Sequence, residues 1–162
     1  MSVVTRAGDD GYTDIIGGKR LPKDHPLIEC LGTLDELNAF LGDVKTSLCD
    51  ISVKNIITEI QKDLFSIMAV IAGNPVPADG IGEGRLDSLI EELEAGLPPF
   101  DSFATVGATA TSAKLHIARA VCRRAERRLV GLGLDGEVRT VVVPYINRLS
   151  DLLFLLAQKE LP

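Results

Sequence analysis

Arginines gather on one short stretch of the chain, between Arg119 and Arg128. Five of the seventeen lysines and arginines in the 162-residue sequence fall there. Arg119, Arg123 and Arg127 are spaced four residues apart, so on a helix their guanidinium groups would line one face. Like charges at this spacing repel, and an opposing anion would remove that cost. Since a guanidinium fork binds phosphate or carboxylate through two donors at once, the spacing favours an anionic ligand.

The alternative is a solvated helix face whose arginines are paired with Glu126 and nearby acids, and spacing alone leaves both interpretations open. A second polar cluster, Asn147, Arg148 and Asp151, interrupts an apolar stretch near the C-terminus. Asn147 and Asp151 are four residues apart and would face the same way on a helix. If buried, such groups need hydrogen-bond partners. They would serve either a ligand or the contact between two helices.

The segment from Thr5 to Thr13 is short and polar and contains Gly8 and Gly11. Loops of this kind can wrap a phosphate with backbone N–H groups. As a motif it is weak, because it is neither a Walker sequence nor a GxGxxG that follows a strand. It therefore indicates a phosphate site only in combination with other segments.

Other chemistries find little support in the sequence. The chain has only two histidines, His25 and His116, and neither stands at the ExxH spacing of di-iron bundles. There is no HExxH, GxSxG or Cys–His pairing. The three cysteines, Cys30, Cys49 and Cys122, are too few and too far apart for a disulfide framework or a CxxC pair, so we expect reduced thiols. We predict neither a covalent nucleophile nor a metal bound by the protein alone, and His116 is typical of a packing residue rather than a base.

Composition is that of a globular protein, with 46% hydrophobic residues, 25% charged residues and no tryptophan. A core of Leu, Ile, Val and Ala suits packed helices. The net charge of −6 argues against general binding to nucleic acid, which needs a basic surface. The N-terminus lacks an apolar signal core, and no apolar run approaches the ~20 residues of a membrane span. We expect a cytoplasmic protein without a membrane segment.

Hydrophobic periodicity predicts five helices and no strand. The first begins at a capping box, Thr33 to Glu36, and the second is capped by Ser52. A third, shorter helix runs to Leu97, a fourth covers Ala108–Leu132, and a fifth covers Thr140–Glu160. Short connections then give an all-α, five-helix antiparallel bundle. We predict a single domain over residues 1–162, with an ordered N-terminal loop at 1–31 and the bundle at 32–162.

In order, these segments resemble the PduO-type ATP:cob(I)alamin adenosyltransferases. Thr5 to Gly18 is similar to the family's T-x-x-G-D-x-G-x-T loop and Gly-Gly-Lys-Arg, and Gly32 to Asn38 to its first-helix signature. Two later signatures match Leu115–Arg127 and Tyr145–Asp151. Each motif is modest alone, but four in order over nearly the whole chain are specific. The resemblance implies a ferritin-like, cobalamin adenosyltransferase-like bundle.

The activity implied by the resemblance is transfer of the 5′-deoxyadenosyl group of ATP to the Co(I) of a corrinoid, with release of triphosphate. ATP, with Mg²⁺, would bind between the subunits of a homotrimer. Asp35 and Arg119 would form an ion pair across the subunit interface. The residues implied in ATP binding are Thr5, Arg6, Gly8, Asp9, Gly11, Thr13, Lys19, Arg123, Glu126, Arg127 and Asn147.

On the corrinoid side, the resemblance implies Phe103 and His116, with Phe103 pushing the lower cobalt ligand away. Arg123, Asn147, Arg119, Asp35 and Phe103 would then form the catalytic set. Because Co(I) itself attacks ATP, the protein would need no nucleophile of its own. A corrinoid reductase and an adenosylcobalamin-dependent enzyme are the further partners that this chemistry implies.

Two departures from the family pattern stand out. Asp10 occupies a position where the family usually has Lys, which places an anion near the phosphates. Val106-Gly107-Ala108-Thr109 replaces the family's Pro-Gly-Gly-Thr/Ser at the entry to the fourth helix. These changes motivate an alternative, a non-catalytic relative that binds or carries ATP or a corrinoid.

Overall fold

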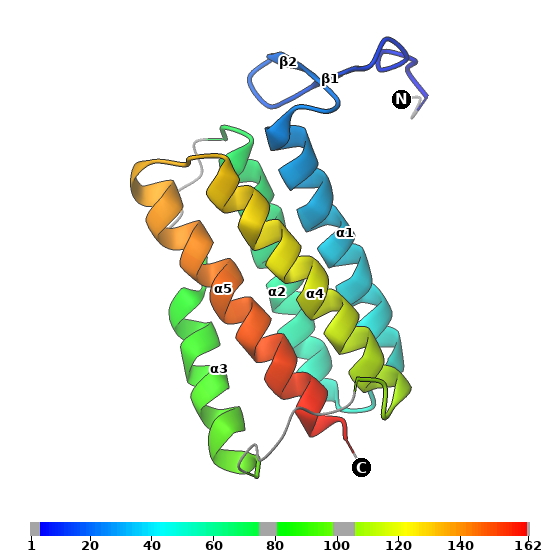
Figure 1. Ribbon diagram of the computed structural model, residues 1–162, viewed down its shortest axis with the longest axis vertical. Helices are drawn as coiled ribbons and strands as arrows, with labels where there is room; N and C mark the ends of the chain where they lie inside the picture. Colours follow the sequence, from blue (N-terminus) through cyan, green and yellow to red (C-terminus); the bar gives the residue numbers. More distant parts are fainter. Residues whose placement is uncertain (1–3, 75–80, 99–105, 162) are drawn as a thin grey trace.

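Five helices account for most of the computed structural model, which describes residues 4–74, 81–98 and 106–161. They are α1 (Pro26–Ser47), α2 (Ile51–Ile71), α3 (Glu83–Gly96), α4 (Ala110–Gly131) and α5 (Gly136–Lys159). Consecutive helices run in opposite directions, so α3 and α5 point the same way (Figure 1). The predicted all-α bundle of five helices is confirmed.

The core lies along α5, which packs against both α4 and α3, while α4 also packs against α1. The predicted apolar stripes supply this core. On α1 the stripe Leu34, Leu37, Leu41 and Val44 is fully buried. Aliphatic side chains at this spacing give each helix one apolar face, and burying those faces against one another stabilises the bundle.

One described helix, α5, has the length and composition of a membrane span over Val138–Lys159, with a mean hydropathy of 1.4. Just over half of that window, 56%, is buried inside the protein. A core helix in a bundle of this size needs an apolar surface on more than one side because it has several neighbours. The apolar character of α5 is thus explained by packing.

The start of α1 differs from the prediction. His25 is the N-cap, its Nδ1 accepts the Leu27 N–H at 3.1 Å, and Pro26 occupies the first turn. Proline suits this position because the missing N–H would have no partner there. The Thr33 hydroxyl donates to the Glu29 carbonyl at 2.7 Å, as it does in a helix interior. The predicted capping box at Thr33 is therefore wrong, and the helix begins seven residues earlier.

Two other helix starts also differ. Asp50, not Ser52, caps α2, since its carboxylate accepts the Ser52 N–H at 2.8 Å. Helix α5 begins at Gly136 rather than Thr140, which leaves Pro144 inside the helix. The start of α4 lies within two residues of the prediction. Its cap, Thr109, accepts the Ser112 N–H at 3.0 Å.

The N-terminal segment contains a small antiparallel hairpin that was not predicted. Strand β1 (Tyr12–Asp14) pairs with β2 (Arg20–Pro22), and Asp14 lies opposite Arg20. The turn uses Gly17 and Gly18 at φ of 87° and 77°, which favour glycine. Strands of three residues, mostly exposed, carry too little periodicity to be recognised in a sequence. The hairpin lies at the end of the bundle where α1 begins (Figure 1).

Candidate functional site

The five arginines of α4 lie in two rows with different surroundings. Arg124 and Arg128 face α1, where Arg124 pairs with Glu36 and Arg128 with Glu29 at 2.6 Å. Arg128 also donates to the Glu29 carbonyl at 2.8 Å. These two arginines therefore hold α4 against α1 and are already neutralised. They are separated from the acids they pair with by most of the chain.

The second row is Arg119, Arg123 and Arg127, the set spaced four residues apart. None of the three forms an ion pair with another residue in the described ranges. Arg123 and Arg127 are exposed, whereas the Nε of Arg119 is buried with no hydrogen-bond partner within those ranges. A row of unpaired guanidinium groups is the arrangement expected of an anion site.

A hollow of about 330 Å³ lies beside this row. It is bounded by α3, α4 and α5. Its lining residues are Glu94 of α3, Arg119 and Arg123 of α4, and Ser150, Asp151, Phe154 and Leu155 of α5. The hollow thus combines two guanidinium groups with an aromatic ring and two carboxylates. Neither Glu94 nor Phe154 carried a sequence signal beyond its residue type, so neither was predicted as a site residue.

Glu126 and Asn147 are brought together from α4 and α5, with Asn147 Nδ2 donating to Glu126 Oε1 at 2.9 Å. Both side chains are half-buried. Glu126 therefore has an amide partner and, among the described residues, no arginine partner. The interpretation of the arginine row as a solvated face paired with Glu126 does not hold for these residues.

His116 lies one turn from Arg119 on α4 and is almost completely buried. Its ring centroid is 6.1 Å from that of Phe154. Burial, and after it the charge of Arg119, lowers the pKa of His116 below its ordinary value. The imidazole is thus neutral at neutral pH. Its Nδ1 has no hydrogen-bond partner among the described residues. His116 is therefore a packing residue with one polar atom left without a partner in those residues.

The buried thiols are not nucleophiles. Burial raises the pKa of Cys30 to about 11 against the opposing charge of Arg128. Burial also raises the pKa of Cys122 far above its ordinary value, and its Sγ donates to the Ile146 carbonyl at 3.3 Å. Both thiols stay protonated at neutral pH, and the thiolate is the reactive form.

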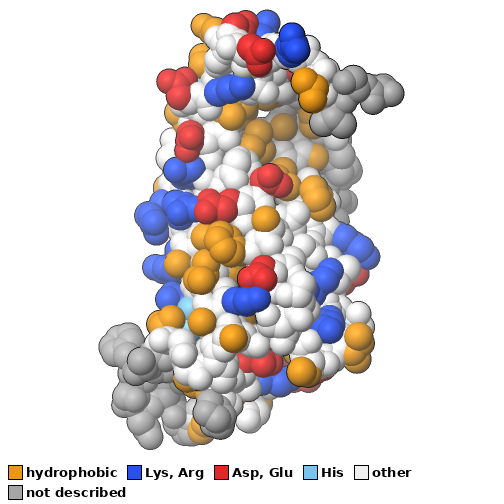
Figure 2. Space-filling model, turned by 90° about the vertical axis from the view of Figure 1, so that its right-hand side faces the viewer, with side chains coloured by type: hydrophobic (Ala, Val, Ile, Leu, Met, Phe, Trp, Pro, Cys, Tyr) orange, Lys and Arg blue, Asp and Glu red, His pale blue; other side chains and the backbone are white. Residues whose placement is uncertain are grey.

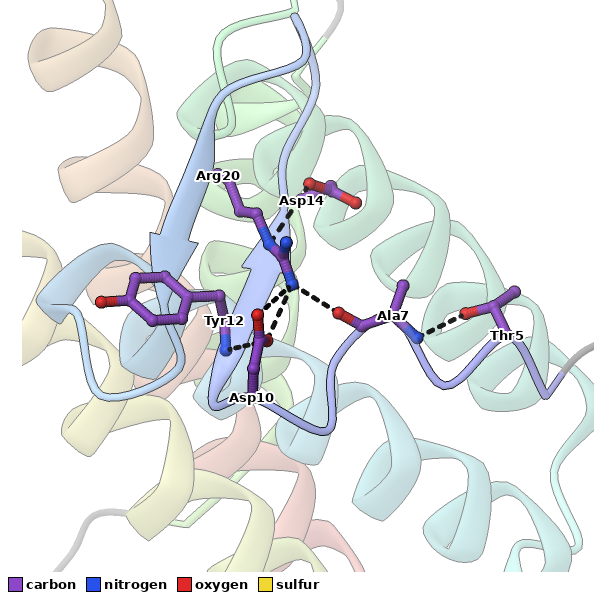
Figure 3. Close-up of polar contacts among 6 residues, drawn as sticks. All are labelled: Thr5, Ala7, Asp10, Tyr12, Asp14 and Arg20. Carbon is purple, nitrogen blue, oxygen red and sulfur yellow. Dashed lines mark hydrogen bonds and ion pairs between the residues drawn. The ribbon is translucent and has the colours of Figure 1, made fainter.

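Arg20 organises the N-terminal segment (Figure 3). Its Nη2 donates to both carboxylate oxygens of Asp10, at 2.7 and 2.9 Å, and to the Ala7 carbonyl. Asp10 also accepts the Tyr12 N–H at 3.2 Å, and the guanidinium lies 5.8 Å from the centroid of the Tyr12 ring. The negative charge of Asp10 is thus neutralised inside the segment. Asp10, which stands where the family usually has Lys, therefore does not add an unpaired negative charge to this segment.

The second departure is also accommodated by the backbone. Gly107 has a φ of 99°, a conformation that favours glycine, and this glycine is retained. Ala108, which replaces the family's second glycine, is not among the described residues with positive φ. Alanine therefore fits at the entry to α4 without backbone strain.

Phe103, the predicted aromatic on the corrinoid side, lies outside the described residues.

Thr13 and Asp35 lie at a second hollow, of about 540 Å³, formed by the hairpin, α1 and the end of α2. Figure 2 shows this hollow beneath the N-terminal segment, with hydrophobic side chains on its walls. Its lining residues are Thr13, Asp14, Ile15, Ile16, Ile28, Leu31, Gly32, Asp35, Met68, Ala69 and Ala72. Asp14 of the hairpin and Asp35 of α1 are thus the two carboxylates of an otherwise mostly apolar lining.

The predicted ATP-binding residues fall into two groups within one chain. Thr5, Arg6, Gly8, Asp9, Gly11, Thr13 and Lys19 belong to the N-terminal segment, and Arg123, Glu126, Arg127 and Asn147 belong to α4 and α5. Among the described residues, the side-chain hydrogen bonds and ion pairs of residues 5–20 stay within that segment. One chain therefore does not join the two groups through such contacts.

The chain is similar in sequence to known adenosyltransferases. A family model described as cobalamin adenosyltransferase matches residues 3–160. The corrinoid adenosyltransferase PduO of Salmonella typhimurium is 39% identical over 99% of this chain and 50% of its own length. A corrinoid adenosyltransferase of Citrobacter freundii is 36% identical over 98% of this chain and 94% of its own length. The chain thus spans about half the length of the PduO relative and nearly all of the Citrobacter freundii one.

Solved structures of similar fold carry ligands. A variant of the PduO-type ATP:corrinoid adenosyltransferase from Lactobacillus reuteri, complexed with cobalamin and ATP, superposes with a TM-score of 0.85. It is 31% identical in sequence, and the match covers 97% of this chain and 92% of that one. A second variant, complexed with ATP, has a TM-score of 0.83 at 33% identity.

Proposed function

Since the chain belongs to the cobalamin adenosyltransferase family, we propose that it transfers the 5′-deoxyadenosyl group of ATP to the Co(I) of a corrinoid. The products are adenosylcobalamin, or the related corrinoid, and inorganic triphosphate. The observation that carries the proposal is the row Arg119, Arg123 and Arg127, which has no ion pair among the described residues and lies beside a hollow. The chain that carries it matches this family over nearly its whole length.

In the proposed reaction, Co(I) donates an electron pair to the ribose C5′ of ATP. The bond between C5′ and the triphosphate oxygen breaks, and its electron pair leaves with the triphosphate. Cobalt is thereby oxidised formally to Co(III). The protein positions the two reactants and stabilises the charge that grows on the leaving group. Arginines serve this purpose, and no protein nucleophile is needed.

Within this scheme Arg123 and Asn147 contact ATP, with Glu126 and Arg127 in support. The N-terminal residues Thr5 to Lys19 wrap the triphosphate. Mg²⁺ would be held mainly through the oxygens of the triphosphate. Magnesium commonly binds through substrate phosphates with few protein ligands. It would neutralise phosphate charge.

We further propose that the protein acts as a cytoplasmic homotrimer whose ATP sites lie between subunits. Two observations support this assembly. The N-terminal residues and the arginine row are not joined by side-chain hydrogen bonds or ion pairs within one described chain. Asp35 and Arg119 also line different hollows, and the buried Arg119 Nε has no partner among the described residues. A neighbouring subunit's Asp35 would supply that partner.

An adenosylation assay tests the proposed function. Folded protein mixed with ATP, Mg²⁺ and chemically reduced cob(I)alamin should form the light-sensitive spectrum of adenosylcobalamin and release triphosphate in equal amount. Product no greater than in a protein-free control would contradict the proposal. Tight ATP or corrinoid binding in calorimetry without triphosphate release would instead favour the carrier alternative.

A further inference from the structure

A chain of hydrogen bonds crosses three helices at Asn147. Glu126 of α4 accepts from Asn147 Nδ2 at 2.9 Å. Asn147 Oδ1 accepts from Arg148 Nη1 at 3.0 Å. Arg148 Nε donates in turn to Asp87 Oδ1 of α3 at 3.1 Å. The amide of Asn147 is thus held from both sides by charged groups that belong to different elements.

The chemistry of the two neighbours fixes which way the amide points. A carboxylate such as Glu126 only accepts hydrogen bonds, and a guanidinium such as Arg148 only donates them. Rotating the Asn147 amide by half a turn would set oxygen against oxygen and nitrogen against nitrogen. The described arrangement is therefore the favourable one of the two. It leaves the second Nδ2 hydrogen without a partner among the described residues.

The contact between Asn147 and Arg148 needs an anchor outside α5. Adjacent residues on a helix point about 100° apart and do not normally face each other. The Arg148 guanidinium must therefore turn toward Asn147, and it can do so while paired with Asp87 on α3. Both members of this pair are close to half exposed, at 43% and 49%. An ion pair this exposed adds little to the stability of the fold. Its main effect is to hold the Arg148 guanidinium against the Asn147 amide.

We propose that Arg148 and Asp87 are positioning residues, which hold the Asn147 amide so that its remaining N–H is directed to the nucleotide. This inference rests on the proposed function, in which Asn147 contacts ATP. Asp87 acts indirectly, because it contacts Arg148 and not the Asn147 amide. A fixed donor binds better than a rotating one, since less conformational freedom is lost on binding.

The test variant is Asp87→Ala, which removes the anchor without touching Asn147. We expect the KM for ATP to rise about three- to tenfold, the effect of one weakened neutral hydrogen bond. The KM for cob(I)alamin and the Tm should change little. Asp43→Ala is the matched control, because Asp43 is 51% exposed and its ion pair with Lys114 joins α1 to α4 instead. That control should leave both KM values unchanged.

A double-mutant cycle then separates positioning from general structure. In an Asn147→Ala background, Asp87→Ala should have no further effect on the KM for ATP. Additive effects, an unchanged KM in Asp87→Ala, or equal rises in both KM values would overturn the inference. Arg148→Lys should resemble Asp87→Ala, because an ammonium lacks the planar fork that bridges the two partners.

The outcome also distinguishes this inference from the proposed function. If the wild-type protein adenosylates and the cycle is additive, only the positioning role fails. If the protein binds ATP without turnover, the proposed function fails, and the same cycle measured by ATP calorimetry decides the positioning role. A wild-type protein that does not bind ATP overturns both.

Discussion

Arg123 and Arg124 are neighbours in the sequence but face different parts of the protein. Arg124 pairs with Glu36 of α1, whereas Arg123 is exposed beside the hollow and unpaired among the described residues. An ion pair already satisfied within the fold offers little to a ligand, because binding would have to break it. The free row is therefore the part of α4 suited to an anion.

Arg123→Ala should reduce kcat/KM for adenosylation about ten- to hundredfold, the contribution of one hydrogen bond to a charged group. The Tm should fall by no more than about 2 °C, since an exposed side chain contributes little to folding. Arg139→Ala, which removes an exposed arginine from α5, is the control. Parallel losses of activity and Tm in Arg123→Ala would show that the arginine is structural.

The Asp10–Arg20 contact is the other residue-scale feature. It closes the segment on itself through Ala7, Asp10 and Tyr12 (Figure 3). Asp10 stands where the family usually has Lys, and its negative charge is neutralised by Arg20 in the nucleotide-free protein. The structural consequence is a segment ordered by its own side chains.

Asp10→Ala and Arg20→Ala should each speed amide hydrogen exchange in residues 7–14 of the ATP-free protein. The double variant should exchange no faster than the faster single variant, because both substitutions remove one interaction. Lys19→Ala is the control, as Lys19 is exposed and has no ion pair within the described ranges. Unchanged exchange in Arg20→Ala would show that the contact does not order the segment.

At the scale of elements, a polar cluster joins α2, α3 and α5; its members Tyr145 and Asp63 are buried, and Arg85 is exposed. The hydroxyl of fully buried Tyr145 donates to Asp63 Oδ2 at 2.7 Å, and Arg85 of α3 donates to the same oxygen. Burial, and then the bond to Asp63, raises the pKa of Tyr145 far above its ordinary value, so the phenol stays protonated. Since α3 packs mainly on α5, this cluster is a principal link between α3 and α2. Asp87 and Glu94 depend on the placement of α3.

Tyr145→Phe should lower the free energy of unfolding by about 1–2 kcal/mol, because nearly buried Asp63 loses a hydrogen bond. Hydrogen exchange in α3 should increase with it. Chemical denaturation measures the first effect. Lys62→Ala, which breaks an exposed ion pair with Glu59 on α2, should change stability by no more than about 0.5 kcal/mol. Equal losses in the two variants would contradict the role given to the polar cluster.

For the whole molecule, the proposed ion pair between Asp35 and Arg119 of neighbouring subunits makes assembly testable. Asp35→Ala and Arg119→Ala should each weaken the trimer and its activity. Mixing the two variants should restore part of both, since some interfaces in a mixed trimer keep both wild-type partners. Sedimentation equilibrium and the adenosylation assay measure the two effects. Recovery absent on mixing, or unchanged assembly in both variants, would contradict an intersubunit pair.

The helices could be predicted from the sequence because their apolar stripes are long, and burial follows from periodicity. Helix starts could not be predicted where local signals compete. Thr33 and Glu36 match a capping box, but Pro26 and His25 start α1 earlier. The hairpin was missed because three-residue strands have too little pattern. Of the predicted site, Arg123, Glu126 and Asn147 could be placed on helices, but their partners could not be known.

The sequence by itself determined that α4 carries five closely spaced basic residues, because helical periodicity is a local property of the chain. Only the tertiary structure decided which of them remain available to a ligand. Arg124 and Arg128 are neutralised by acids of α1 that lie 88 and 99 residues away along the chain. Charge pairing depends on distance in space, which the fold sets and spacing in the sequence does not.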